Sequence, residues 1–273
     1  EHDLEGVEEE AKFLAAFEEK EKLADRGLLV AVRVNDWMRE LAPWEAPQPS
    51  GNSLFGDGAP TFLEKLLLLI PALRARYDLS EDCPVLLGGY SLAGFFALWA
   101  SYRTDAFAAV AAASPSLWFQ GFMKYQRGRT PRVKALSLSL GDREEKVRNE
   151  MMASCGNLMR QYHEQLSERM QPGTLVLEWN PGGHFDDNAK RTARRRCSPA
   201  TPEKHCDKRA SVLYCSTEYV SFASNMLIQR TDYPGGRPDG ISGRAERKQY
   251  GSDHGDRAEG RFSEGNHRSV QPR

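Results

Sequence analysis

The segment Cys83–Ser101, which reads CPVLLGGYSLAGFFALWAS, constrains the fold more than any other part of the sequence. The apolar run at Pro84–Leu87 is typical of a buried strand, and the apolar residues that close the segment favour a helix. Between them Ser91 stands in a tight turn, with Gly89 two residues before it and Ala93 two residues after it. Side chains at these two flanking positions must be small if the serine backbone is strained. The pattern is typical of a nucleophile elbow, although a serine in an ordinary strand-to-helix turn is the alternative.

Residues 1–187 alternate predicted strands with predicted helices. Runs of apolar residues predict strands at 28–34, 84–87, 107–113, 133–140 and 174–179. Amphipathic or leucine-rich patterns predict helices at 7–25, 61–77 and 146–170, the second of them capped by Thr61. Residues 35–57 are expected to form a long loop. This alternation predicts an α/β fold with a mostly parallel sheet covered by helices on both faces.

The distribution of charge divides the chain into two parts. Of 37 Lys and Arg and 38 Asp and Glu, 17 and 10 respectively fall in residues 190–273. That part is also rich in Gly, Pro and Ser and shows little periodicity, with 212–228 as the only stretch that could be ordered. We therefore expect a folded, acidic domain at 1–189 and a basic, largely disordered tail at 190–273.

Composition also argues against several classes of protein. No run approaches the roughly 18 consecutive apolar residues of a membrane span, and no charged-then-apolar leader opens the sequence. The five cysteines are odd in number and irregularly spaced, which fits a reducing cytoplasm. The tail has no C-x-x-C pair and no aromatic residues interleaved with its basic ones. We expect a cytoplasmic protein with no metal, cofactor, nucleic acid or membrane partner.

A histidine and a group of acids follow later strands. His184 closes the Pro-Gly-Gly turn after the last predicted strand, and it is the only one of the six histidines at a strand's carboxyl end. Asp142, Glu144 and Glu145 follow the strand before it. Serine, acid and histidine in this chain order, each after a different strand, match the arrangement used for nucleophilic acyl transfer. The alternatives are a turn histidine and a solvated run of charges at the start of a helix.

Four sequence segments resemble the esterase family of α/β-hydrolases that includes esterase D-like enzymes and enterobactin-type siderophore esterases. They are GYSLAG at 89–94, ASPSLW at 113–118, LGDRE at 140–144 and WNPGGHF at 179–185, and NDWMRELAPW at 35–44 is similar to a further family segment. The resemblance covers about residues 2–187. It implies Glu144 as the acid that orients His184, with Asp142 second. It also implies that the front of the fold is missing from this chain.

Two backbone N–H groups and four side chains complete the predicted site. The Leu92 N–H, at the start of the helix after Ser91, is expected to bind an oxyanion. The resemblance places a second donor at residues 2–6, represented by Leu4. The side chains expected to contact substrate are Trp37, Arg39, Tyr90 and Trp118. The alternatives are aromatic loop anchors for the tryptophans and a surface ion pair of Arg39 with Glu40 or Glu45.

Together these features predict a serine carboxylic ester hydrolase. It would act on a small-molecule ester through an acyl-enzyme formed on Ser91, without metal or cofactor. Two alternatives stay open on the sequence alone. One is a catalytically inactive hydrolase-fold binding protein, and the other is an acyltransferase that uses the same acyl-enzyme.

Overall fold

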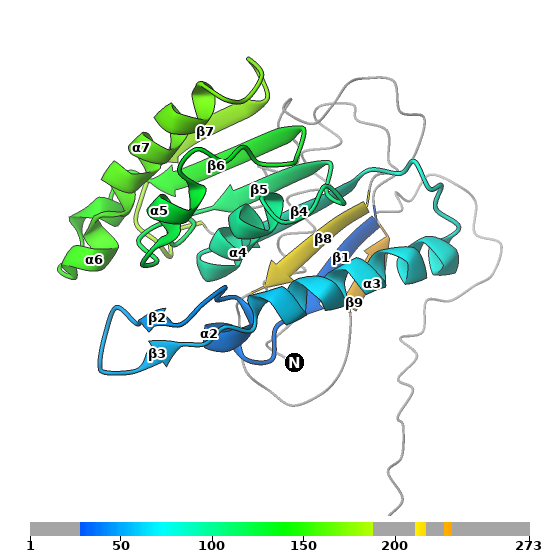
Figure 1. Ribbon diagram of the computed structural model, residues 1–273, viewed down its shortest axis with the longest axis horizontal. Coiled ribbons are helices and arrows are strands. Elements are labelled where there is room, and N and C mark those ends of the chain that lie inside the picture. Colours follow the sequence, from blue (N-terminus) through cyan, green and yellow to red (C-terminus); the bar gives the residue numbers. More distant parts are fainter. Residues whose placement is uncertain (1–27, 188–210, 217–226, 231–273) are drawn as a thin grey trace, which may run out of the picture. The chain divides into compact units, whose positions relative to one another are not determined.

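A seven-stranded sheet organises the described part of the molecule (Figure 1). The computed structural model describes residues 28–187, 211–216 and 227–230, all of which belong to one compact unit. The strand order is β7-β6-β5-β4-β8-β1-β9. The strands are β1 (Leu28–Arg33), β4 (Val85–Tyr90), β5 (Ala109–Ala113), β6 (Ala135–Gly141), β7 (Leu175–Asn180), β8 (Ser211–Ser216) and β9 (Leu227–Arg230). Neighbouring strands are parallel except β9, which runs antiparallel to β1.

The helices fall mainly in the connections between the parallel strands. They are α2 (Trp37–Glu40), α3 (Ala59–Tyr77), α4 (Leu92–Ser101), α5 (Phe122–Gln126), the 3-10 helix η2 (Glu144–Lys146), α6 (Glu150–Ala153) and α7 (Cys155–Ser167). A two-stranded sheet of β2 (Ala46–Pro47) and β3 (Leu54–Phe55) lies between α2 and α3 in the chain. Within the described ranges, no helix combines the length and the apolar character that a bilayer crossing requires.

Both faces of the central strands are buried. Every residue of β4, β5 and β6 is buried, as expected for parallel strands covered on both sides. One face joins the large apolar cluster that also takes in the buried side chains of α3, α4, α5 and α7. The other face carries a separate small cluster, formed by Leu86, Ala109 and Ala135. The predicted α/β fold with a mostly parallel sheet is therefore confirmed.

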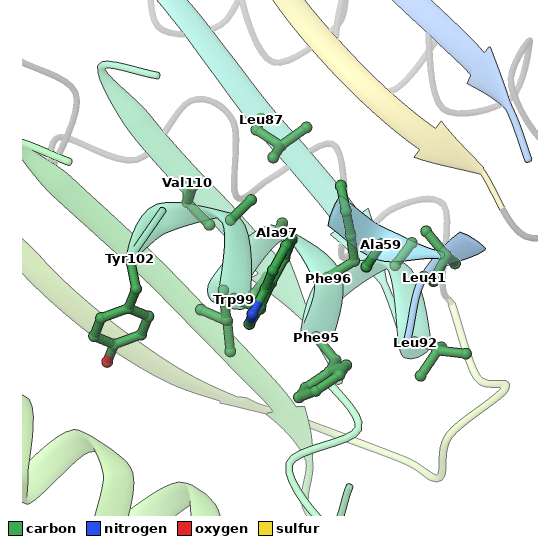
Figure 2. Packing of buried hydrophobic residues seen from close by; sticks show 14 of the residues in the cluster. Leu41, Ala59, Leu87, Leu92, Phe95, Phe96, Ala97, Trp99, Tyr102 and Val110 are labelled. Atoms are coloured by element: carbon green, nitrogen blue, oxygen red, sulfur yellow. The ribbon is translucent and has the colours of Figure 1, made fainter. Parts of the chain in front are cut away.

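Helix α4 lies at the centre of this packing, because all ten of its residues are buried. Its aromatic side chains Phe95, Phe96 and Trp99 pack in the same cluster as Leu87 of β4 and Val110 of β5 (Figure 2). Burial of side chains this large contributes about 1.5–3 kcal/mol each to folding. The helix that follows Ser91 is thus anchored along its whole length.

Three predicted elements differ in detail from the structure. Helix α3 is capped by Gly58 rather than Thr61, with Pro60 in the first turn, where the missing proline N–H costs no helical hydrogen bond. The single helix predicted at 146–170 is broken into η2, α6 and α7, because Asn149 caps a new helix by accepting from the Met152 N–H. The loop predicted at 35–57 contains α2, β2 and β3. The helix predicted at 7–25 lies outside the described residues.

Strands β8 and β9 come from the segment expected to be a tail. Residues 211–216 and 227–230 are the described part of 190–273, and they overlap the stretch 212–228 that the sequence marks as capable of order. β8 lies parallel between β1 and β4, so the tail segment supplies a central strand of the sheet. The division of the chain at residue 189 stays a prediction.

Candidate active site

Ser91 occupies a sharp turn between β4 and α4. Its backbone has φ 58° and ψ −122°, in the left-handed half of conformational space that non-glycine residues rarely adopt. Backbone hydrogen bonds hold it there. The Ser91 N–H donates to the Ala113 carbonyl at 2.9 Å, and the Ser91 carbonyl accepts from the N–H groups of Phe95 and Ser116 at 3.0 and 3.2 Å. The turn is therefore fixed by the strand beside it and by the helix after it.

The small residues around Ser91 let β4 and α4 approach closely. A Cβ atom placed on Gly89 would lie 2.4 Å from the carbonyl carbon and the carbonyl oxygen of Ala93. A Cβ atom on Gly94 would lie 2.9 Å from the Gly89 carbonyl oxygen. Real Cβ atoms do not come this near to rigid backbone, so the turn requires glycine at position 89.

Replacing Gly89 with alanine is expected to destabilise the protein by about 3 kcal/mol or more, because the clash is with backbone that cannot move away. Urea unfolding followed by circular dichroism measures the change. The matched control is Gly183→Ala, because the nearest atom to a Cβ there is 3.7 Å away. The control should stay within about 0.5 kcal/mol of the parent. Equal stability of the two variants would contradict this account of the turn.

His184 lies between Ser91 and Glu144. Its Nε2 atom is 3.0 Å from the Ser91 Oγ, and its Nδ1 atom is 2.7 Å from Oε2 of Glu144. The imidazole is 23% exposed and the Glu144 side chain 4% exposed, so the histidine is open to solvent and the acid is not. The Tyr90 ring packs against the imidazole with ring centroids 5.1 Å apart. This serine–histidine–carboxylate chain has the geometry required for moving a proton off a hydroxyl.

Glu144 is held as a charged carboxylate by several donors. Its Oε1 atom accepts from the Ser114 hydroxyl at 2.6 Å and from the Gly141 N–H at 2.7 Å, while Oε2 faces His184. Burial by itself raises the pKa of Glu144. The hydrogen bonds from its partners outweigh burial and hold the pKa below its usual value. The carboxylate therefore stays ionised at neutral pH despite being buried.

The loop that carries His184 is braced by backbone and side-chain contacts. The Gly182 N–H donates to Oδ1 of Asp142 at 2.9 Å, and the Gly182 carbonyl accepts from the Arg143 N–H at 3.0 Å. The Gly183 N–H donates to Asp186 at 2.7 Å. Gly182 has φ 108°, which favours glycine at that position. These contacts fix the turn and hence the position of the imidazole.

The three acids after β6 have separate surroundings. Glu144 is buried and contacts His184. Asp142 is exposed and supports the Gly182 turn. Glu145 forms two hydrogen bonds with Arg160, at 2.9 and 3.0 Å, which lower the pKa of Glu145 against the small opposing effect of burial. Among these three acids, the geometry brings Glu144 to the histidine.

The remaining predicted site residues are placed as follows. Leu92 is the first residue of α4, where backbone N–H groups have no partner within a helix, and Leu4 lies outside the described residues. Trp37 and Trp118 are half-buried, and Trp118 packs against Phe55 with ring centroids 6.2 Å apart. Tyr90 is buried against His184. Arg39 is exposed on α2.

The ion pair considered for Arg39 does not involve Glu40. The Glu40 carboxylate accepts from the N–H groups of Asn35 and Asp36 and lies 3.8 Å from Lys65. Within residues 28–187 and the two short strands, no group of three or more His, Cys, Asp or Glu side chains could hold a metal ion.

Two donors to Glu144 are not among the site residues predicted from the sequence. They are the Ser114 hydroxyl and the Gly141 N–H. A signal for Ser114 exists, because Ser-Pro directly follows the strand that neighbours the serine strand. No local pattern marks the Gly141 N–H.

The described parts match the α/β-hydrolase arrangement at the level of fold. A parallel sheet carries a strand–serine–helix turn near its centre, and the acid and histidine loops follow strands β6 and β7 in chain order.

No family model matches the chain, and no curated protein matches it. Among solved structures, the chain is similar to an IroE-like serine hydrolase from Shewanella oneidensis, at 20% identity and a TM-score of 0.46, over 57% of this chain and 54% of that one. It is also similar to the siderophore hydrolases EstA and EstB from Aspergillus nidulans, at 21% and 22% identity and TM-scores of 0.45 for both. These matches cover 59% and 64% of this chain and 64% and 67% of the others. The chain thus spans about half the length of the Shewanella structure, and the likeness to all three is distant.

Proposed function

We propose that the chain is a serine hydrolase that cleaves carboxylic esters through an acyl-enzyme. One observation carries the proposal, namely the continuous chain from the Ser91 hydroxyl through His184 to Glu144, with contacts of 3.0 and 2.7 Å. A serine hydroxyl is a weak nucleophile at neutral pH and needs a base within hydrogen-bond reach. His184 is within that reach, and it presents its second nitrogen to a buried carboxylate.

In the first half-reaction the Ser91 Oγ attacks the ester carbonyl while Nε2 of His184 takes the hydroxyl proton. The tetrahedral intermediate then collapses, the bond to the alcohol oxygen breaks, and His184 returns the proton to the leaving alcohol. In the second half-reaction water replaces the alcohol. His184 takes a proton from the water, the acyl bond to Oγ breaks, and the carboxylic acid leaves with the serine restored.

Two further groups stabilise charge in this scheme. Glu144 holds the imidazole in the tautomer that carries a proton on Nδ1, and it stabilises the imidazolium that forms during attack. The Leu92 N–H, at the first position of α4, is the donor that we assign to the oxyanion, supported by the dipole of a ten-residue helix. A donor of this kind typically contributes about 10²–10³-fold to kcat.

A fluorophosphonate probe tests the proposal, because it phosphonylates the oxygen of an activated serine with loss of fluoride and leaves an inert serine unmodified. We expect rapid labelling of the folded protein, with peptide mapping that identifies Ser91. Heat-denatured protein and the His184→Ala variant, which lacks the base, are the controls and should label slowly. Labelling of the folded protein no faster than that of the denatured control would contradict the proposal and favour a non-catalytic hydrolase fold.

A further inference from the structure

Ser114 lies directly after β5, the strand next to the serine strand, in an unusual backbone conformation. Its φ is 46°, in the left-handed region that favours glycine, and it is 1% exposed. The Ser114 N–H donates to the Ser139 carbonyl at 2.8 Å, next to the last pair of β5 with β6, Ala113 and Ser139. A glycine would adopt this conformation more readily. What serine adds is a hydroxyl, and that hydroxyl donates to Oε1 of Glu144 at 2.6 Å.

The two oxygens of Glu144 have different partners. Oε1 accepts from Ser114 and from the Gly141 N–H, and Oε2 faces Nδ1 of His184. A carboxylate fixed at one oxygen by two donors cannot rotate about its terminal bond without breaking both. The Ser114 hydroxyl therefore restricts the direction in which the second oxygen can point.

The segment Ala113–Ser116 also touches the nucleophile turn. The Ala113 carbonyl accepts from the Ser91 N–H, and the Ser116 N–H donates to the Ser91 carbonyl. Ala113 and Ser116 thus contact Ser91 through the backbone, and Ser114 between them contacts Glu144 through its side chain. The short buried segment 113–116 therefore contacts both Ser91 and Glu144, the two ends of the serine–histidine–acid chain.

We propose that Ser114 is a positioning residue that sets the orientation of Glu144 toward His184. The proposal rests on the proposed function, since it assigns Ser114 a role in the same proton relay. Within the described residues the Ser114 hydroxyl donates to Glu144 and to neither Ser91 nor His184, so the proposal requires the effect of removing this hydroxyl to pass through Glu144. That requirement separates a positioning role from a general effect on folding.

A double-mutant cycle tests this requirement with the fluorophosphonate labelling rate as the readout. Ser114→Gly removes the hydroxyl and relaxes the backbone, so the fold is expected to persist. We expect labelling about 10- to 100-fold slower than in the parent, the range typical of a lost hydrogen bond to a charged group. In a Glu144→Gln background the same change should have less than about a threefold effect, because the group it acts through has been altered. Ser114→Ala, which keeps the Cβ atom, should behave like Ser114→Gly.

The outcomes separate the two proposals. An equal loss from Ser114→Gly in both backgrounds, or no loss in the parent, would overturn the positioning role of Ser114. Absence of labelling in the parent would instead overturn the proposed function. In that case the proton shared between His184 and Glu144, seen as a far-downfield proton NMR signal, supplies a readout that does not need activity. That signal should shift or broaden in Ser114→Gly and stay in Ser101→Ala, and an unchanged signal in both would overturn the positioning role.

Discussion

Replacing Ser91 with alanine is expected to lower kcat/KM for a short-chain p-nitrophenyl ester by about 10⁴-fold or more, the loss typical of removing the nucleophile from a working triad. The reason is that no other described hydroxyl lies at the His184 Nε2, which is 3.0 Å from the Ser91 Oγ. Alanine differs from serine only by the hydroxyl and faces the same left-handed backbone. The measurement is the initial rate of p-nitrophenol release at substrate concentrations well below KM.

The matched control for this prediction is Ser101→Ala. Ser101 lies at the other end of α4, where its hydroxyl donates to the Leu98 carbonyl at 2.6 Å. Ser101→Ala removes a serine hydroxyl from the same helix and leaves Ser91, His184 and Glu144 unchanged, so the activity should stay within a few-fold of that of the parent. A Ser91→Ala variant that hydrolyses the ester at a rate near that of the parent would contradict the assignment of Ser91 as the nucleophile.

Replacing Glu144 with glutamine is expected to lower kcat by about 10³–10⁴-fold, as neutralising the acid of a triad does elsewhere. An amide cannot stabilise the imidazolium that forms when His184 accepts a proton. Its NH₂ group, if turned toward Nδ1, also favours the wrong tautomer. Steady-state kinetics with the same ester gives the comparison, and the loss should fall on kcat rather than on KM.

Glu145→Gln is the control for the acid, since Glu145 is the next residue and pairs with Arg160 near the surface. An exposed pair of this kind contributes little to stability, so the variant should keep its activity. Asp142→Asn is expected to have a smaller effect than Glu144→Gln, because Asp142 supports the Gly182 turn and not the imidazole. A larger loss in Asp142→Asn than in Glu144→Gln would move the acid role to Asp142.

The lowered pKa of Glu144 predicts a dependence of stability on pH in the parent that Glu144→Gln lacks. A carboxyl with a folded pKa below its unfolded value contributes stability that is fully present above the unfolded pKa, about 4.3, and is lost as pH falls through the folded pKa. Between pH 6 and pH 3, the free energy of unfolding should therefore fall more for the parent than for Glu144→Gln. Urea titrations at the two pH values measure this, and equal decreases would contradict the ionised state of Glu144.

The sheet could be predicted largely because its strands are buried on both faces. Such strands read as continuous apolar runs, as at β4 and β6, and their positions differ from the predicted ones by a few residues. Strands β8 and β9 overlap the one stretch of the tail that the sequence marks as capable of order. Their positions in the sheet could not be predicted, because they depend on pairing with strands distant in sequence, which no local pattern encodes. The break between η2 and α7 likewise depends on Asn149, whose Nδ2 donates to the Pro49 carbonyl 100 residues away in sequence.

The part of the candidate site that follows from the positions of the strand ends could be predicted from the sequence. Parallel strands place their carboxyl ends at one edge of the sheet, which is why residues after β4, β6 and β7 meet there. Sequence alone left the choice among Asp142, Glu144 and Glu145 to a family resemblance. The geometry separates them, because the short η2 turn directs Glu144 inward. The Ser-Pro after β5 marks Ser114 only as a turn residue, and its hydrogen bond to Glu144, 30 residues away in sequence, leaves no periodic signal.

The central claim is that Ser91 forms a covalent acyl-enzyme, and trapping that intermediate tests it most directly. The protein is mixed with a p-nitrophenyl ester whose acyl group is removed slowly by water, quenched in acid, and measured by intact-mass and peptide mass spectrometry. Our account predicts a mass increase equal to one acyl group, located on Ser91 and absent from Ser91→Ala. An adduct on another residue, or release of p-nitrophenol without any adduct on Ser91, would contradict it.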